Sequence, residues 1–131
     1  EYGSAQDRDL FRVEPAREIL EAERLFAAEL LELQTEVNRR GSRLLLAVLP
    51  TKMEREDPVA RAPNFRPGRV AERVRAVAKS HGIAWADLSP LRREEGIFLA
   101  DDYHLSAHGH ERVAERLSVA IRGAKKSGAY D

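Results

Sequence analysis

One short segment near the C-terminal end of the chain gathers side chains suited to acid–base chemistry. It runs from Phe98 to His110 and reads FLADDYHLSAHGH. An aspartate three residues before a histidine, in a tight loop, can accept the imidazole Nδ1–H; this fixes the tautomer and leaves Nε2 free as a general base. The spacing therefore predicts that Asp101 orients His104, and that the adjacent Asp102 is dispensable for proton transfer.

A simpler interpretation of the same residues stays open. An aspartate or serine just before a helix commonly accepts hydrogen bonds from the first backbone N–H groups of that helix. On this alternative the segment is a solvated loop whose Asp or Ser caps the next helix, and its histidine has no catalytic partner.

The elements expected to position this segment alternate between helices and strands. A stripe of apolar residues at helical spacing, with Pro15 before it and Gly41 after it, predicts a helix from about 15 to 39. The remaining expectations are a strand at 44–49, a long loop at 51–67, a helix at about 70–82, a strand at 83–86, a helical turn within 89–96, a helix at 107–122, and irregular ends at 1–12 and 123–131.

This order predicts a three-layer α/β/α fold around a parallel sheet, of the flavodoxin-like type. The segment 44–49 reads LLLAVL and is apolar at every position, which is typical of a strand buried on both faces. Only one other strand is predicted, at 83–86, so the sheet looks incomplete. We expect the open edge of 44–49 to be met by residues 1–12, by a second copy, or by a part of a longer protein.

Length and composition limit the remaining classes. The 131 residues suit one domain or the C-terminal portion of one, and 22 Lys and Arg balance 22 Asp and Glu. Because this balance gives no long-range attraction for phosphates, nucleic acid is not expected as a partner. No apolar run reaches the roughly 20 residues of a membrane span. The chain has no cysteine. It begins at Glu1 and not at a methionine, so we expect it to be processed, trimmed or excised from a longer protein.

The C-terminal segment resembles the closing block of the SGNH (GDSL-like) hydrolases. That block contains Asp-x-x-His, then Asn or Ser, then Gly, and is followed by an Ala-rich helix. The residues that fill these places here are Asp101, His104, Ser106, Gly109 and His110. The segment 46–52, LAVLPTK, also resembles the fourth strand and its exit in membrane-linked bacterial members, so the likeness extends over about residues 15–122.

The resemblance implies a five-stranded parallel sheet and the hydrolysis or transfer of ester-linked acyl groups, often acetyl groups on carbohydrate. It implies His104 as general base, Asp101 as its orienting carboxylate, and no cofactor. Lys52, just past the first strand, is a candidate for binding an anion or carbonyl of the substrate; the alternative is a solvated loop lysine. The expected partner is an ester-bearing small molecule or a carbohydrate, in an extracytoplasmic bacterial setting.

The sequence departs from the family at the nucleophile. The Gly-Asp-Ser block, the glycine of the second block and the Gly-x-Asn-Asp block are absent, and Ser4 is a poor substitute because no strand precedes it. We therefore expect the chain alone to show no esterase activity, and to self-associate or pair with a missing N-terminal portion. An alternative function is a catalytically silent remnant that serves as a binding or assembly module.

A third hypothesis, from another class, is a His-rich metal protein. Histidine and aspartate side chains are common metal ligands, and several lie close together in the sequence. These are Asp101, Asp102, His104, His108 and His110. The hydrolase block and the start of a helix already account for them, so the sequence predicts no metal.

Overall fold

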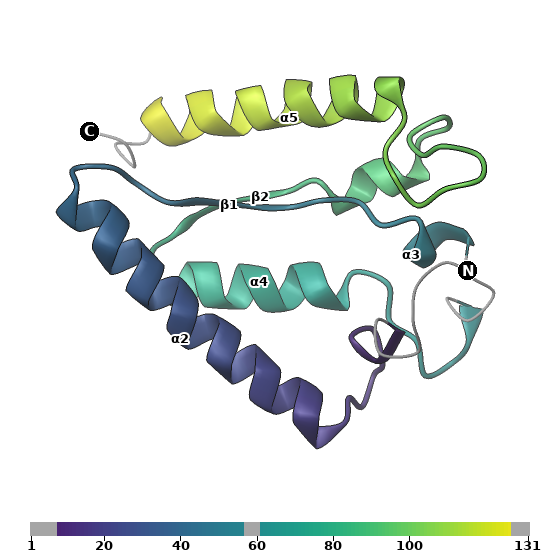
Figure 1. Cartoon of the computed structure of the whole chain (residues 1–131), viewed down its shortest axis with the longest axis horizontal. Coiled ribbons are helices and arrows are strands. Elements are labelled where there is room, and N and C mark those ends of the chain that lie inside the picture. Colours follow the sequence, from purple (N-terminus) through teal and green to yellow (C-terminus); the bar gives the residue numbers. More distant parts are fainter. Residues whose placement is uncertain (1–7, 57–60, 127–131) are drawn as a thin grey trace.

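The computed structural model describes residues 8–56 and 61–126. The described part contains helices on both sides of a short parallel sheet (Figure 1). In chain order the elements are α2 (Arg17–Arg39), β1 (Leu45–Val48), α3 (Met53–Glu56), α4 (Arg69–Ser80), β2 (Ala84–Asp87), the 3-10 helix η2 (Ser89–Arg93) and α5 (Ala107–Lys126).

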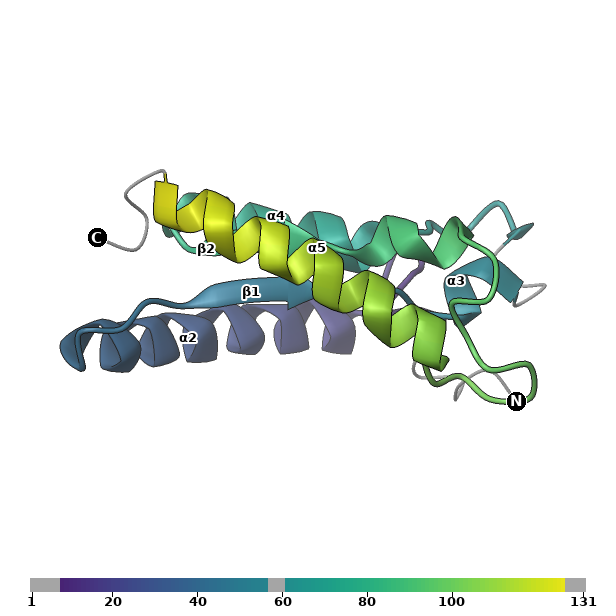
Figure 2. The same ribbon diagram turned by 90° about the horizontal axis from the view of Figure 1, so that it is seen from above.

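The two strands form a parallel ladder, as the alternation of elements predicted. Leu45 is paired with Ala84 and Val48 with Asp87. Helix α5 lies on one face of the sheet, whereas α2 and α4 lie on the other (Figures 1 and 2). This is the three-layer α/β arrangement expected from the sequence, present as a partial fold. The carboxyl ends of both strands point to the same end of the molecule, where open α/β sheets build their sites.

Helix α4 ends where the sequence predicted a stop. Gly82 adopts a φ of 64°, in the left-handed region that glycine enters without steric cost. The N–H of the next residue, Ile83, donates to the carbonyl of Ala78 at 2.9 Å and so satisfies a carbonyl in the last turn of the helix. The turn at Gly82 therefore directs the chain from α4 into β2.

The prediction of a strand buried on both faces is wrong in part. Leu45, Leu46 and Val48 are only half-buried, and Ala47 and Leu49 are exposed. The reason is that β1 is hydrogen-bonded to β2 alone among the strands of the described residues. Its apolar sequence suits a larger sheet than the described residues build.

Two further expectations need correction. The predicted loop at 51–67 contains the short helix α3. The last helix continues to Lys126 rather than ending at about residue 122, so the first part of the expected irregular tail is helical. The expectation that the open edge of 44–49 is met by residues 1–12, by a second copy or by a part of a longer protein stays a prediction. Arg12 forms an isolated bridge with Phe65 and not with β1, and residues 1–7 lie outside the described residues.

The core lies between the sheet and α5. Its fully buried member is Ile97. The other buried residues of this cluster are Ala86, Leu88, Leu91, Phe98 and Val113. A second, smaller cluster of Phe11, Met53 and Phe65 joins the N-terminal segment to α3. The first cluster lies next to the segment that the sequence marked for chemistry, because Ile97 and Phe98 lead into that segment.

Within the described ranges, no helix is long and apolar enough to cross a membrane.

Candidate active site

The chemistry-bearing segment is a hairpin-like loop, residues 99–104, whose base is an isolated antiparallel bridge between Phe98 and Leu105. Two backbone hydrogen bonds close this base. The N–H of Leu99 donates to the backbone carbonyl of His104 at 3.0 Å, and the N–H of Ser106 donates to the backbone carbonyl of Ile97 at 2.9 Å. Buried apolar residues thus fix the base of the loop and leave its tip at the surface.

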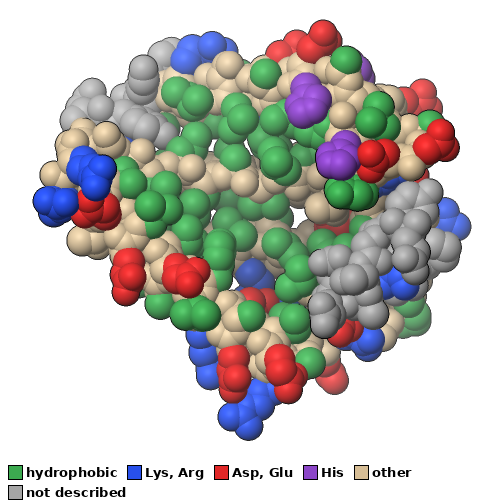
Figure 3. Space-filling view, viewed as in Figure 1, with side chains coloured by type: hydrophobic (Ala, Val, Ile, Leu, Met, Phe, Trp, Pro, Cys, Tyr) green, Lys and Arg blue, Asp and Glu red, His purple; other side chains and the backbone are tan. Residues whose placement is uncertain are grey.

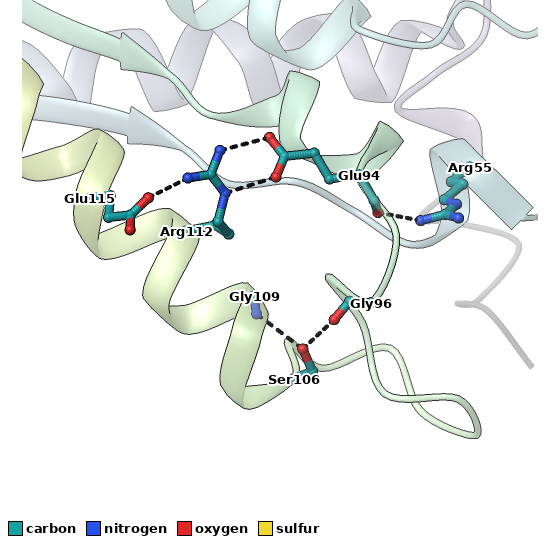
Figure 4. Close-up of polar contacts among 7 residues, drawn as sticks. All are labelled: Arg55, Glu94, Gly96, Ser106, Gly109, Arg112 and Glu115. Atoms are coloured by element: carbon teal, nitrogen blue, oxygen red, sulfur yellow. Dashed lines mark hydrogen bonds and ion pairs between the residues drawn. The ribbon is translucent and has the colours of Figure 1, made fainter.

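Ser106 joins this base to the start of α5 (Figure 4). Its hydroxyl donates to the carbonyl of Gly96 and accepts the N–H of Gly109 at 3.0 Å. The second bond is the N-cap interaction that serine makes with the first turn of a helix. The helix-cap part of the simpler interpretation is therefore correct for Ser106.

Glycine is required at position 109 because the first turn of α5 lies very close to the backbone of Ile97. A Cβ atom built on it would overlap the carbonyl oxygen of Ile97 and crowd the Cβ of Leu105. The absence of a side chain lets the first turn of α5 lie directly against the backbone at the base of the loop.

A bidentate ion pair holds the preceding segment to α5 (Figure 4). The Arg112 guanidinium donates to the Glu94 carboxylate at 2.8 and 3.2 Å and also to Glu115. The contact with Arg112 lowers the pKa of the Glu94 carboxyl below its ordinary value. The Glu94 carbonyl in turn accepts from Arg55 of α3 at 2.6 Å. The loop therefore starts from a segment tied to two helices.

The tip of the loop carries a histidine–carboxylate pair. Nδ1 of His104 lies 2.9 Å from Oδ2 of Asp102. The other carboxylate oxygen of Asp102 accepts the N–H of Tyr103 at 2.6 Å, and the Tyr103 ring stacks on the imidazole with centroids 4.3 Å apart. The Asp102 carboxylate thus contacts one edge of the imidazole, and the Tyr103 ring covers one of its faces.

The charge state of Asp102 suits the role of acceptor. Its hydrogen bond with His104, helped by the N–H of Tyr103, lowers the pKa of the Asp102 carboxyl below its ordinary value. An ionised carboxylate can only accept, so Nδ1 of His104 donates and Nε2 of the neutral ring is left as a base. The His104 side chain is 61% exposed, so the ring is open to an approaching group.

In the structure Asp102, and not the expected Asp101, lies beside the imidazole of His104. Asp101 is exposed and makes no hydrogen bond with the imidazole, whereas Asp102 occupies that place. The reason is local: the N–H of Tyr103 holds one oxygen of Asp102 and thereby turns the other toward the ring two residues along the chain. The signal that could have found this was the shorter spacing, Asp-x-His.

Lys52 is buried, so it is not the solvated loop lysine of one of the two interpretations. Its side chain is 2% exposed, and Nζ donates to the carbonyl oxygens of Leu99, Ala100 and Asp102 at 2.6, 2.7 and 3.0 Å. The structure thus brings Lys52 to the predicted site, beneath the loop.

Histidine side chains gather near the start of α5, beside acidic side chains (Figure 3). Even so, residues 8–56 and 61–126 contain no group of three or more His, Asp or Glu that could hold a metal ion. His108 and His110 are exposed residues in the first turn of α5. Among the described residues of this segment, the contact between a histidine and a carboxylate is the one between His104 and Asp102.

No nucleophile is bonded to His104 within the described part of the chain. The side-chain hydrogen bond of His104 is with Asp102, and the hydroxyls of Ser80, Ser89 and Ser106 donate to Val77, Asp87 and Gly96, respectively. Ser4, weighed above as a poor candidate, lies outside the described residues. The described site therefore contains a histidine–carboxylate pair, His104 and Asp102.

Comparison with known proteins shows the family of the chain. Residues 6–130 match the family model of the SGNH hydrolase-like domain of the acetyltransferase AlgX. The chain belongs to this family. The SGNH resemblance drawn from the C-terminal block is thereby confirmed, and with it the α/β fold class.

The chain is also similar to one curated protein. The chain is 35% identical over 96 residues to a protein of Pseudomonas aeruginosa described as a probable alginate O-acetylase, AlgJ. The match covers 68% of the chain and 24% of AlgJ, so the chain spans about a quarter of that relative's length. No solved structure matches the chain.

Proposed function

We propose that this chain supplies the general base and its orienting carboxylate for an SGNH-type acyl-ester transfer reaction. His104 is the base and Asp102 orients it. The observation that carries the proposal is the 2.9 Å contact between Nδ1 of His104 and the Asp102 carboxylate on an open loop. A merely solvated loop would not need to fix the imidazole in one tautomer.

The chemistry follows from the two nitrogens of the ring. Nε2 of His104 takes the proton of a hydroxyl as that oxygen bonds to the acyl carbon, and the imidazolium then gives a proton to the departing alcohol oxygen. The Asp102 carboxylate stabilises the imidazolium formed between the two transfers. A serine outside the described residues supplies the attacking hydroxyl and carries the acyl group before its transfer.

The proposed substrate is an acetyl ester whose acetyl group passes to a hydroxyl of a carbohydrate. Membership of an AlgX-type acetyltransferase family supports acyl transfer over simple hydrolysis. The description of AlgJ as an alginate O-acetylase supports a polysaccharide as the acceptor. The chain covers only a quarter of that relative, and residues beyond this chain would shape the acceptor site.

A silent binding or assembly module is the second candidate. The observation in its favour is that none of the described serines is hydrogen-bonded to His104. The two candidates differ in whether loss of the imidazole changes a rate of acyl transfer.

The deciding experiment uses the protein at its natural length with a small acetyl ester as donor and an oligosaccharide as acceptor. His104→Gln should lower the rate of acetyl transfer by about 10²–10⁴-fold, the usual contribution of a positioned acid–base group. His81→Gln, a change at an exposed histidine at the end of α4, is the matched control and should leave the rate unchanged. An active wild-type protein with equal rates for both variants would exclude His104 as the base.

A further inference from the structure

Lys52 is the most deeply buried charged side chain near the candidate active site. The residue is 3% exposed and lies just beyond the carboxyl end of β1. Figure 1 shows the end of β1 and the loop between β2 and α5 at the same end of the sheet. Burial of an ammonium group costs several kcal/mol unless hydrogen bonds compensate, so a lysine at this position requires a structural reason.

The compensation comes from the loop that carries the histidine–carboxylate pair. Nζ of Lys52 donates to the carbonyls of Leu99, Ala100 and Asp102 at 2.6–3.0 Å, and the carboxylate of Glu56 lies 3.5 Å away. Three carbonyl oxygens that converge on one point repel one another, and a cation between them removes this repulsion. Lys52 therefore favours one backbone path for the loop over more open paths.

This path determines where the Asp102 carboxylate lies. The carbonyl of Asp102 is held by Lys52, and one side-chain oxygen is held by the N–H of Tyr103. With the backbone and one oxygen fixed, the second oxygen meets Nδ1 of His104. The backbone hydrogen bonds that close the loop lie at its base, next to Phe98 and Leu105, so they constrain the tip less directly.

We propose that Lys52 is a positioning residue that acts through Asp102 to keep His104 in its reactive orientation. The inference rests on the proposed function. It assigns to Lys52 a role other than the substrate contact expected from the sequence, because Nζ faces the loop backbone from beneath.

The test compares Lys52→Met with Lys79→Met in the protein at its natural length. Methionine keeps most of the length and apolar contacts of lysine and removes the donors. Lys79 is an exposed lysine of α4, so its replacement controls for loss of one positive charge. The readouts are the NMR signals of the His104 ring, the pKa of the Asp102 carboxyl, and kcat and KM for acetyl transfer.

The expected result is specific to the histidine–carboxylate pair. In Lys52→Met the Nδ1–H signal of His104 should broaden or vanish and the pKa of Asp102 should rise toward its ordinary value. The kcat should fall about 100-fold, the effect of misplacing a catalytic group by roughly 1 Å, with KM changed less than about threefold. Lys79→Met should match the wild type in every readout.

Lys52→Arg keeps the test decisive if the methionine variant fails to fold. A guanidinium keeps the charge but distributes its donors over a planar fork, so it cannot direct three donors from one atom. It should raise the pKa of Asp102 and lower kcat in a folded protein. A folded variant at position 52 with unchanged His104 signals and Asp102 pKa would overturn the proposal. This outcome is distinguishable from failure of the proposed function, in which His104→Gln itself leaves transfer intact.

Discussion

At the scale of single residues, the candidate site depends on which of two adjacent carboxylates meets an imidazole. The sequence identified the segment and His104, because few residue types can exchange a proton near neutral pH. From the Asp-x-x-His spacing it favoured Asp101, whereas the structure places Asp102 beside the imidazole. The choice is made by the N–H of Tyr103 and by Lys52, which lies 50 residues earlier in the chain.

Lys52 shows the same limit more sharply. A lysine after a strand gives no sign in the sequence of whether its ammonium faces water or the protein. The answer depends on the carbonyl groups of residues 99–102, and these reach Lys52 only when the carboxyl end of β1 and the loop before α5 are brought together. A contact of this range depends on the tertiary fold and not on local sequence propensity.

At the scale of elements, the long helices and both strands were predictable because their signals are periodic or continuous. The apolar stripe and Gly41 predicted α2, and Gly82 predicted the end of α4. Helix α3 was missed because four residues are too few to show a helical period. Its hydrogen bonds include Arg55 and Glu56 N–H groups donating to the carbonyl of Lys52, so it forms around the buried lysine.

Gly109 allows a direct test of how the loop is joined to α5. Gly109→Ala should lower the free energy of unfolding by about 1–3 kcal/mol, the usual cost of overpacking. The cause is the overlap between the new Cβ and the Ile97 carbonyl. Urea denaturation followed by circular dichroism measures the change.

A glycine elsewhere in α5 supplies the control for that substitution. A Cβ at Gly123 would meet nothing within 4 Å, and alanine is favoured over glycine inside a helix by about 0.5–1 kcal/mol. Gly123→Ala should therefore leave the free energy of unfolding unchanged or raise it. A stabilisation of equal size in both variants would show that α5 does not pack against the base of the loop as described.

At the scale of the whole molecule, the sheet is smaller than its sequence suggests. Strand β1 is apolar throughout but half-buried, and β2 is its single strand partner in the part of the chain that the structure describes. An exposed apolar edge of this kind favours pairing with another chain. The sequence predicted this mismatch, because a fully apolar strand expects neighbours on both sides.

We expect the 131-residue chain by itself to self-associate at micromolar concentration. Sedimentation velocity should detect species larger than a monomer. A lysine on the edge strand opposes such pairing, so Ala47→Lys, at an exposed position of β1, should shift the distribution toward monomer. Monodisperse monomer in the unmodified chain at all concentrations would contradict this account of the open edge.

The most direct test of the central claim compares the two neighbouring carboxylates by their effect on catalysis. In the protein at its natural length, Asp102→Asn removes the acceptor for Nδ1–H of His104 and should lower kcat for acetyl transfer by about 10²–10⁴-fold. Asp101→Asn makes the same chemical change one residue away, at a side chain without a hydrogen bond to His104, and should alter kcat less than about threefold. A large loss for Asp101→Asn with a small loss for Asp102→Asn, or equal losses for both, would contradict the assignment of Asp102 as the carboxylate that orients His104.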